Sequence, residues 1–505
     1  MHDIIGGFAH IATLHYFIVI AVGCAIGIAA GATPGMSSAS AVALLVPFTF
    51  TMDAIGSLAL LGAVYTGAQY GGSISATLMN TPGSPESAVI AFDGYPLAQQ
   101  GLAGKALTAL TFAGLVGGLI GTVVLVSAVV PLAHEALRFG PIEMFALAIF
   151  GITVVGSIST GGFARGLLCA ILGMLLTTIG QDPITATDRF TFGAPALLGG
   201  LPFIPAIIGL FAVSEVFALI AKRDHTTRLT TVNIKRQFPS DRREAGTWLR
   251  FMVVGAGVGL FVAIHPGGGA TVASLIAYSV ARQISKHPKL FGKGAIEGII
   301  TPESADKATV GGALIPLLGL GVPGSATTAV LIGAFTLHGI EPGPMIFKNH
   351  ADIVYALFAS LFIANLVVFA LGFLGVPIFA RVTLIPRKLL IGGISALCFV
   401  GAFANGGNML AVYTALGFGF LGFALKAAKL PVPPVVLGLV LGPLLETNLR
   451  QSLIITGGSV LPLVQSPIAL TLYALGIASV AGPWFTNRMR ITRPFRTVLP
   501  EESPV

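Results

Sequence analysis

Uncharged apolar runs, as long as a lipid bilayer is thick, constrain this chain more than any other feature. Residues 106–133 contain no Asp, Glu, Lys or Arg, and a helix needs about 20 mainly apolar residues to cross the hydrocarbon. Of the 505 residues, 54% are apolar and 10% are charged, whereas a soluble domain carries about 25% charged residues. This composition excludes a soluble enzyme, a disordered protein and a nucleic-acid-binding protein. It predicts an all-α polytopic membrane protein.

Two kinds of apolar segment are present. The continuous ones cover residues 8–30, 106–133, 144–161, 353–380, 389–404, 410–425 and 468–485. The ones interrupted by Pro or Gly cover residues 41–65, 166–180, 194–219, 251–281, 308–337 and 432–445. Together they predict about 12 membrane elements, the interrupted ones being broken helices or re-entrant hairpins.

Basic residues are distributed unevenly along the chain. Residues 1–104 contain no Lys or Arg, whereas residues 222–250 contain eight, and a further cluster lies at 488–496. Because basic loops next to membrane spans stay in the cytoplasm, we expect both clusters to be cytoplasmic. The predicted organisation is a first membrane repeat (1–221), a basic cytoplasmic loop (222–250), a second membrane repeat (251–487) and a cytoplasmic C-terminal tail (488–505).

The two halves of the chain share an ordered set of motifs. Thr33-Pro34-Gly35 corresponds to His265-Pro266-Gly267, and Pro82-Gly83-Ser84 corresponds to Pro323-Gly324-Ser325. A Gly-Gly pair precedes the later motif in each half, at 71–72 and at 311–312. The common order predicts an internal repeat.

Repeated helix breaks of this kind are typical of the binding sites of secondary transporters. A Pro-Gly break frees backbone N–H groups on one side and carbonyl groups on the other. Free N–H groups at a helix N-terminus attract anions, and free carbonyls attract a cation such as sodium. We therefore expect the Pro-Gly loops to meet near the middle of the bilayer, and transport to proceed by moving one bundle against another, as in an elevator.

At these motifs the chain resembles the large membrane subunit of the tripartite tricarboxylate transporters. The resemblance covers most of the sequence. It rests on Gly31, Pro34 and Gly35, on segments 70–74, 80–83, 93–96 and 302–305, on Gly311-Gly312, on segments 320–325 and 339–344, and on Glu446, Arg450 and Ser452. The family often has two asparagines where this chain has Asp306-Lys307.

The resemblance implies a permease subunit in a bacterial inner membrane. Its implied partners are a small four-helix membrane subunit and a periplasmic solute-binding protein, and its cargo is a citrate-like or other small carboxylate. Uptake would be driven by an ion gradient, with sodium as the expected coupling ion and a proton as the alternative, and no tightly bound cofactor is expected.

The broken segments and their polar neighbours supply the candidate binding residues. For the cargo these are Thr33, Pro34, Gly35, Ser73, Asn80, Thr81, Pro82, Gly83, Ser84, Pro266, Gly267, Glu303, Lys307, Pro323, Gly324 and Ser325. For sodium they are Asn80, Thr81, Asp306 and Gly321. Tight turns and helix capping are the structural alternative for the loops, and an ion pair is the alternative for Glu303 and Lys307.

Two other charged motifs have structural interpretations. Asp93 begins Asp-Gly-Tyr-Pro, which predicts a turn leaving the membrane. Glu446 and Arg450 are four residues apart, which predicts an ion pair on one helix face.

Three other functional classes remain as alternatives. A stand-alone secondary anion transporter would use the same site without partners. An intramembrane enzyme would need a motif such as His-Glu-x-x-His, but His134-Glu135 lacks the second histidine. A channel is disfavoured because channels are usually built from repeated short subunits.

Overall fold

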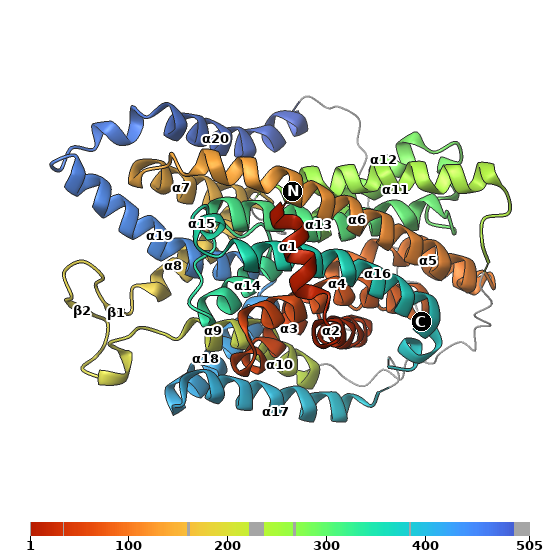
Figure 1. The fold of residues 1–505 in the computed structure, drawn as a ribbon, viewed down its shortest axis with the longest axis horizontal. Helices are drawn as coiled ribbons and strands as arrows, with labels where there is room; N and C mark the ends of the chain where they lie inside the picture. Colours follow the sequence, from red (N-terminus) through yellow and green to blue (C-terminus); the bar gives the residue numbers. More distant parts are fainter. Residues whose placement is uncertain are drawn as a thin grey trace.

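The computed structural model describes residues 2–33, 35–158, 162–221, 237–265, 269–382 and 385–488. These residues are almost entirely helical (Figure 1), and the β-structure among them is one antiparallel pair, β1 (Gly180–Gln181) and β2 (Asp188–Arg189). Within the described part of the chain, seven helices are long and apolar enough to cross a membrane: Leu14–Ala32, Ala103–Ala136, Phe203–Ala221, Arg242–Ala263, Ala351–Gly375, Lys388–Asn405 and Met409–Ala427. The predicted all-α polytopic membrane fold is confirmed.

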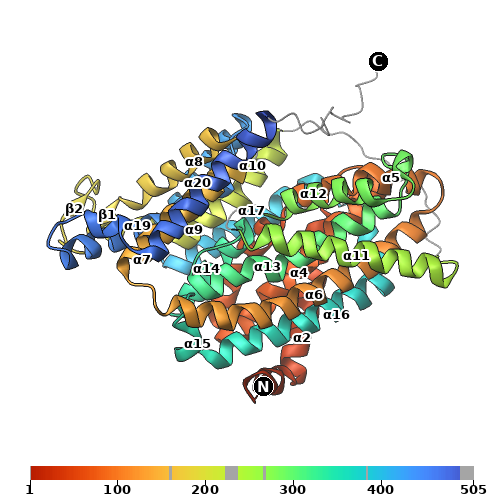
Figure 2. The ribbon, with the colours of Figure 1, turned by 90° about the horizontal axis from the view of Figure 1, so that it is seen from above.

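The helices form two bundles, which Figure 2 shows side by side. Bundle 1 contains α1 (His2–Ile11), α2 (Leu14–Ala32), α4 (Ala54–Met79), α5 (Ala91–Gln99), α6 (Ala103–Ala136), α11 (Arg242–Ala263), α12 (Gly269–Ile284), α13 (Glu297–Leu320), α15 (Ile346–Asn349) and α16 (Ala351–Val382). Bundle 2 contains α7 (Pro141–Ile158), α8 (Phe163–Thr177), α9 (Phe203–Ile208), the π-helical turn η4 (Gly209–Val213), α10 (Ser214–Ala221), α17 (Arg387–Gly406), α18 (Met409–Ala427), α19 (Pro433–Ile455) and α20 (Pro467–Arg488). Each bundle therefore draws helices from both halves of the chain.

Two short helices lie between the bundles. α3 (Ser38–Leu45) and α14 (Ala326–Leu337) contact both of them. The remaining turns are 3₁₀-helical: η1 (Val46–Thr51), η2 (Pro85–Val89), η3 (Pro195–Leu197), η5 (Pro288–Leu290) and η6 (Leu461–Val464).

α4 and α13 form the centre of bundle 1. Their side chains are buried almost without exception. Most of them are small or apolar, but α13 also buries Glu303, Asp306 and Lys307. α4 packs between α2 and α16, and α13 packs between α11 and α6. The helices approach closely at Gly71 and Gly311, where a side chain would overlap the carbonyl oxygens of Ile28 and Gly121.

Both central helices end in the same way. α4 ends at Asn80 and α13 at Gly321, each in the left-handed backbone region (φ 52° and 74°). A proline follows two residues later in each case, at Pro82 and Pro323. A left-handed residue followed by proline is a common helix stop, so the repeated sequence motifs correspond to two real helix ends.

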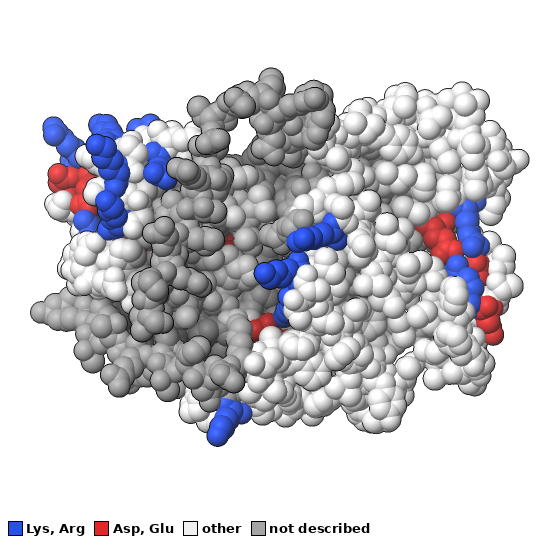
Figure 3. Space-filling view, turned by 180° about the vertical axis from the view of Figure 1, so that it is seen from behind, with Lys and Arg blue, Asp and Glu red and all other residues white. Residues whose placement is uncertain are grey.

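Charged side chains gather at both ends of the long axis. Figure 3 shows Lys and Arg predominating at one end and both signs of charge at the other, with a smaller group of mainly basic side chains near the middle of this face. Exposed basic residues of α11, α12 and the turn after α12 include Arg242, Arg243, Arg282, Lys286 and Lys289. Large apolar side chains such as Leu374 and Phe261 are exposed on helix faces between the ends, as expected for surfaces that contact lipid.

The structure corrects four sequence expectations. The segment 8–30 is divided between α1 and α2, with a break at residues 12–13. Residues 242–250 belong to helix α11 and not to a loop, and α13 begins at Glu297, before the predicted apolar segment. Asp93 lies within helix α5 and not in a turn. Its side chain is fully buried because its carboxylate accepts hydrogen bonds from within the protein.

Candidate functional site

A cavity of about 380 Å³ lies between the two bundles. We call it the loop cavity because all four Pro-Gly loop regions reach it: Gly35 and Ser37 from the first, Pro85 and Glu86 from the second, Gly269 and Ala270 from the third, and Ser325 and Thr327 from the fourth. Bundle 2 closes the other side with residues of η4, α10, α18 and α19. The volume lies within the range of about 300–1,000 Å³ that is usual for small-molecule sites.

Helix starts surround the loop cavity. Ser37 caps α3 by accepting the N–H of Ser40 (3.1 Å), and Ser325 caps α14 by accepting the N–H of Thr328 (3.2 Å). α12 also begins at the cavity, at Gly269. The segment after Pro82 begins as the 3₁₀ turn η2, and α5 follows it directly at Ala91. Pro85 occupies its first position, where the missing N–H group of proline costs no hydrogen bond.

Hydroxyl groups and a carboxyl from different loops meet in the wall of the loop cavity. The Ser38 hydroxyl donates to Glu86 Oε1 (2.9 Å) and lies 3.2 Å from the Thr327 hydroxyl. The hydroxyl group of Tyr65, on α4, lies 3.4 Å from the hydroxyl group of Ser325. These contacts join segments from both halves of the chain at one polar site.

Bundle 2 contributes an ion pair to the same cavity. Lys426 Nζ on α18 lies 2.7 Å from Glu215 Oε2 on α10. Glu215 thus balances the charge of Lys426 in this structure. Glu86 has no such cationic partner among the described residues.

Deeper polar groups lie behind this wall. Gln69 lines the cavity and donates to the Thr309 hydroxyl (3.4 Å), while its own carbonyl oxygen is buried without a partner. Asp306 is fully buried on α13, and both of its carboxyl oxygens lack a hydrogen-bond partner among the described residues.

Glu303 and Lys307 are buried in bundle 1 and do not line the loop cavity. Glu303 Oε2 accepts a hydrogen bond from Ser73, and Lys307 Nζ donates to the Thr66 carbonyl at 2.5 Å and lies 5.6 Å from the centre of the Tyr70 ring. Each therefore bonds to α4, and within the described residues no ion pair joins the two. A backbone carbonyl and an aromatic ring thus hold the Lys307 ammonium group, and its predicted role at the cargo stays a prediction.

Several predicted residues have packing or capping roles. A side chain at Gly83 would overlap the Gly31 carbonyl oxygen, and one at Gly324 would come within 2.7 Å of Ala313 Cα. These glycines therefore allow close backbone packing and do not simply leave space for an anion. The Thr33 hydroxyl donates to the Ala29 carbonyl (3.0 Å), Thr81 donates to the Met79 carbonyl (3.4 Å), and Ser84 pairs with Ser87.

Of the predicted cargo residues, Gly35 and Ser325 line the loop cavity. Pro34, Pro266 and Gly267 lie outside the described residues. The predicted sodium residues Asn80, Thr81, Asp306 and Gly321 do not line this cavity either, so the sodium site stays a prediction.

Sequence reasoning missed other residues of the cavity. The most informative are Ser38, Gln69, Glu86, Glu215, Thr327 and Lys426. Glu86 was detectable, since it is one of the few charges in the first hundred residues and directly follows a Pro-Gly loop. Glu215 and Lys426 are far apart in the sequence and carry no motif that predicts their pairing.

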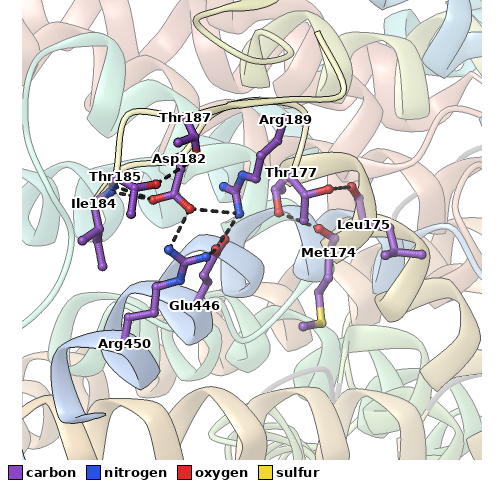
Figure 4. A network of polar contacts seen from close by, with 11 residues as sticks. Met174, Leu175, Thr177, Asp182, Ile184, Thr185, Thr187, Arg189, Glu446 and Arg450 are labelled. Carbon is purple, nitrogen blue, oxygen red and sulfur yellow. Dashed lines mark hydrogen bonds and ion pairs between the residues drawn. The ribbon is translucent and has the colours of Figure 1, made fainter. Parts of the chain in front are cut away.

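A second, larger hollow of about 660 Å³ lies beside the β1–β2 loop, and no Pro-Gly loop lines it. Figure 4 shows the ionic network next to it. Glu446 Oε1 lies 2.6 Å from Arg189 and 2.9 Å from Arg450, while Asp182 Oδ2 lies 2.7 Å from Arg450 and 3.6 Å from Arg189. The predicted Glu446–Arg450 ion pair is thus confirmed. Its wider role is to fasten the loop between α8 and α9 to α19.

This arrangement of broken helices around a cavity inside a polytopic helical protein is typical of a secondary transporter. The model of the tripartite tricarboxylate transporter TctA family matches residues 17–437, and the chain belongs to that family.

Two relatives come from Agrobacterium vitis. An uncharacterized 52.8 kDa protein from the TAR-I ttuC' 3' region is 38% identical over 465 residues, covering 91% of each chain. An uncharacterized protein from the TAR-II ttuC' 3' region is 37% identical over 222 residues, covering 44% of this chain and 92% of its own length. No solved structure matches the chain.

Proposed function

We propose that this chain is the large permease subunit of a binding-protein-dependent secondary transporter and that the loop cavity binds a small di- or tricarboxylate. The observation that carries this proposal is the meeting of all four Pro-Gly loop regions at one cavity. The helix starts at Ser38, Gly269 and Ala326 give it partial positive charge. Lys426 adds an ammonium group, whose charge Glu215 balances in this structure.

The charges around the cavity support coupling to an ion. Two carboxyl groups, Glu86 and Glu215, and one ammonium group, Lys426, line it. A carboxylate cargo that enters would face the uncompensated charge of Glu86, and repulsion in a poorly hydrated site is strong. A cation that enters with the cargo would remove this repulsion. The resemblance to the family favours sodium, with a proton as the alternative.

The position of the cavity supports alternating access by movement of the bundles. Bundle 1 and the loops form one wall, and bundle 2 forms the other. A displacement of one bundle past the other would expose the cavity first to one side of the membrane and then to the other. We propose an elevator-like movement of this kind.

Family membership supports the proposed setting. We propose assembly with a small four-helix membrane subunit and a periplasmic solute-binding protein in a bacterial inner membrane. The positive-inside rule supports a cytoplasmic location for residues 222–250 and for the C-terminus. Labelling of a cysteine at position 235 or 493 from the periplasm of intact cells would contradict this orientation.

Reconstituted uptake tests the proposal. The full chain is placed in proteoliposomes with its small membrane subunit, and uptake of labelled citrate, malate and succinate is measured with and without the binding protein and a sodium gradient. Saturable uptake that needs the binding protein supports the proposal. Uptake by the chain alone would support a stand-alone transporter, and chemical conversion of the carboxylate would support an enzyme.

A matched pair of variants on α14 tests the cavity assignment. Thr327→Val removes a cavity hydroxyl. We expect a KM about 10- to 150-fold higher, because a hydrogen bond to a charged group contributes about 1.5–3 kcal/mol. Thr336→Val is the control, since Thr336 lies outside the loop cavity and bonds to carbonyls of its own helix. Equal KM values for the two variants would refute the assignment.

A further inference from the structure

Asp306 is a buried carboxyl group without an evident structural role. It lies in the middle of α13 with an exposed fraction of 0%, and neither oxygen has a hydrogen-bond partner among the described residues. A carboxylate accepts hydrogen bonds only, and one that is buried without donors costs several kcal/mol. Its environment therefore favours a neutral group or an additional bound cation.

Four titratable groups face Asp306 from the elements packed around it. Glu303 and Lys307 lie on its own helix, Glu86 comes from η2 and Tyr65 from α4. The cluster thus contains three carboxyl groups and one ammonium group. Full ionisation would leave two negative charges without compensation in a buried region, which is unfavourable even for well-bonded groups.

Hydrogen bonds distinguish the three carboxyl groups. Glu86 accepts from the Ser38 hydroxyl, and Glu303 accepts from the Ser73 hydroxyl. Asp306 accepts from neither a hydroxyl nor a backbone N–H group within the described chain. Hydrogen-bond donors stabilise the ionised form of a carboxyl group. Protonation would therefore weaken the hydrogen bonds of Glu86 and Glu303, whereas the Asp306 carboxyl group has none to lose.

The cluster reaches the loop cavity through Glu86. Glu86 lines the cavity and interacts electrostatically with Asp306 behind it. Tyr65 and Gln69, which also line the cavity, complete the wall in front of α13. Glu86 is therefore the carboxyl group of this cluster that lies at the cavity.

We propose that Asp306 is a proton-carrying group of the transport cycle, an inference that rests on the proposed function. With the cavity facing outward, the Asp306 carboxylate binds a proton that arrives from the cavity through Glu86 and becomes a carboxylic acid. With the cavity facing inward, the same O–H bond breaks and the proton leaves. One proton then enters with each carboxylate cargo, whether or not sodium also enters.

Comparing accumulation with exchange tests this role. The complete complex is reconstituted, and labelled citrate, malate and succinate are supplied with an acidic exterior and no sodium. We expect the wild type to accumulate a carboxylate above its external concentration. Asp306→Asn should equilibrate the cargo without accumulating it, yet should exchange external for preloaded internal cargo at a nearly unchanged rate. Asp352→Asn is the control, because Asp352 is exposed on α16 and should behave as the wild type.

The outcomes separate this proposal from the proposed function. Accumulation by Asp306→Asn equal to the wild type, or wild-type accumulation that ignores the proton gradient, would overturn the role of Asp306. Absence of uptake and exchange in the wild type for all three carboxylates, both without sodium and after a sodium gradient is added, would instead contradict the proposed function.

A spectroscopic measurement covers the case in which Asp306→Asn neither accumulates nor exchanges. Infrared difference spectra of the wild type and the variant should show a band of a protonated carboxylic acid that is present only in the wild type. Spectra without this band across the pH range of transport would overturn the proposal.

Discussion

Asp93 provides a quantitative test of how α13 is held in place. Its Oδ1 accepts four backbone N–H groups, from Gly292 (2.8 Å), Lys293 (3.1 Å), Gly294 (2.8 Å) and Ala295 (2.9 Å). Its Oδ2 accepts the Tyr278 hydroxyl (2.9 Å). α13 begins two residues after this turn, so one carboxylate on α5 fixes the start of the central helix.

The magnitude follows from which donors can reach water. Each hydrogen bond to a charged group contributes about 1.5–3 kcal/mol. The 292–294 backbone is at least partly exposed and can bond to water, whereas Ala295 is buried and Tyr278 is half-buried. Asp93→Ala should therefore cost about 3–6 kcal/mol, and Asp93→Asn about half as much, because an amide oxygen accepts weaker bonds.

Thermal unfolding of the purified chain in detergent measures this cost. We expect a melting temperature several degrees lower for Asp93→Ala, an intermediate value for Asp93→Asn, and a wild-type value for the exposed control Asp352→Asn. If Asp93→Ala melts together with the control, the turn is held by other contacts and the reasoning is wrong.

Three further predictions concern packing, the ionic network and the cavity. Gly83→Ala should prevent stable assembly, since its methyl group would overlap the Gly31 carbonyl oxygen. Gly257→Ala, with open space around it, is the control and should express and melt as the wild type. Equal yields of the two variants after size-exclusion chromatography would contradict this. The backbone N–H groups of Thr185 and Ile184, together with Arg450, hold the pKa of Asp182 below its usual range. The Asp182 carboxylate therefore stabilises the fold at neutral pH and loses this effect as the pH falls. The difference in melting temperature between wild type and Asp182→Asn should shrink below about pH 4. A difference that grows on acidification would refute this prediction. Lys426→Gln should raise the KM for citrate more than for acetate because it removes the cavity's cation, and equal effects on both would argue against direct contact.

The sequence predicted the helical membrane fold because long uncharged segments allow few other structures. It also predicted that the Pro-Gly motifs mark important positions, since a proline after a left-handed residue is a strong local stop signal. Gly35 and Ser325 at the loop cavity follow directly from those motifs.

The remaining site residues depend on tertiary contacts. Glu215 and Lys426 pair across 211 positions of sequence, and no local pattern encodes such a pairing. Glu303 and Lys307 have the spacing of a helical ion pair, yet each bonds to α4 because a close neighbouring helix offers Ser73 and the Thr66 carbonyl. The roles of Gly83 and Gly324 likewise depend on which backbone lies opposite them.

Protection of a cavity thiol by cargo tests the central claim most directly. Thr327→Cys places a thiol in the loop cavity, and the native Cys24, Cys169 and Cys398 are buried. In proteoliposomes that take up a given carboxylate, the account predicts that this carboxylate slows maleimide labelling at position 327 and leaves labelling of Thr336→Cys unchanged. Labelling at position 327 that proceeds equally fast with and without a transported carboxylate would contradict the account.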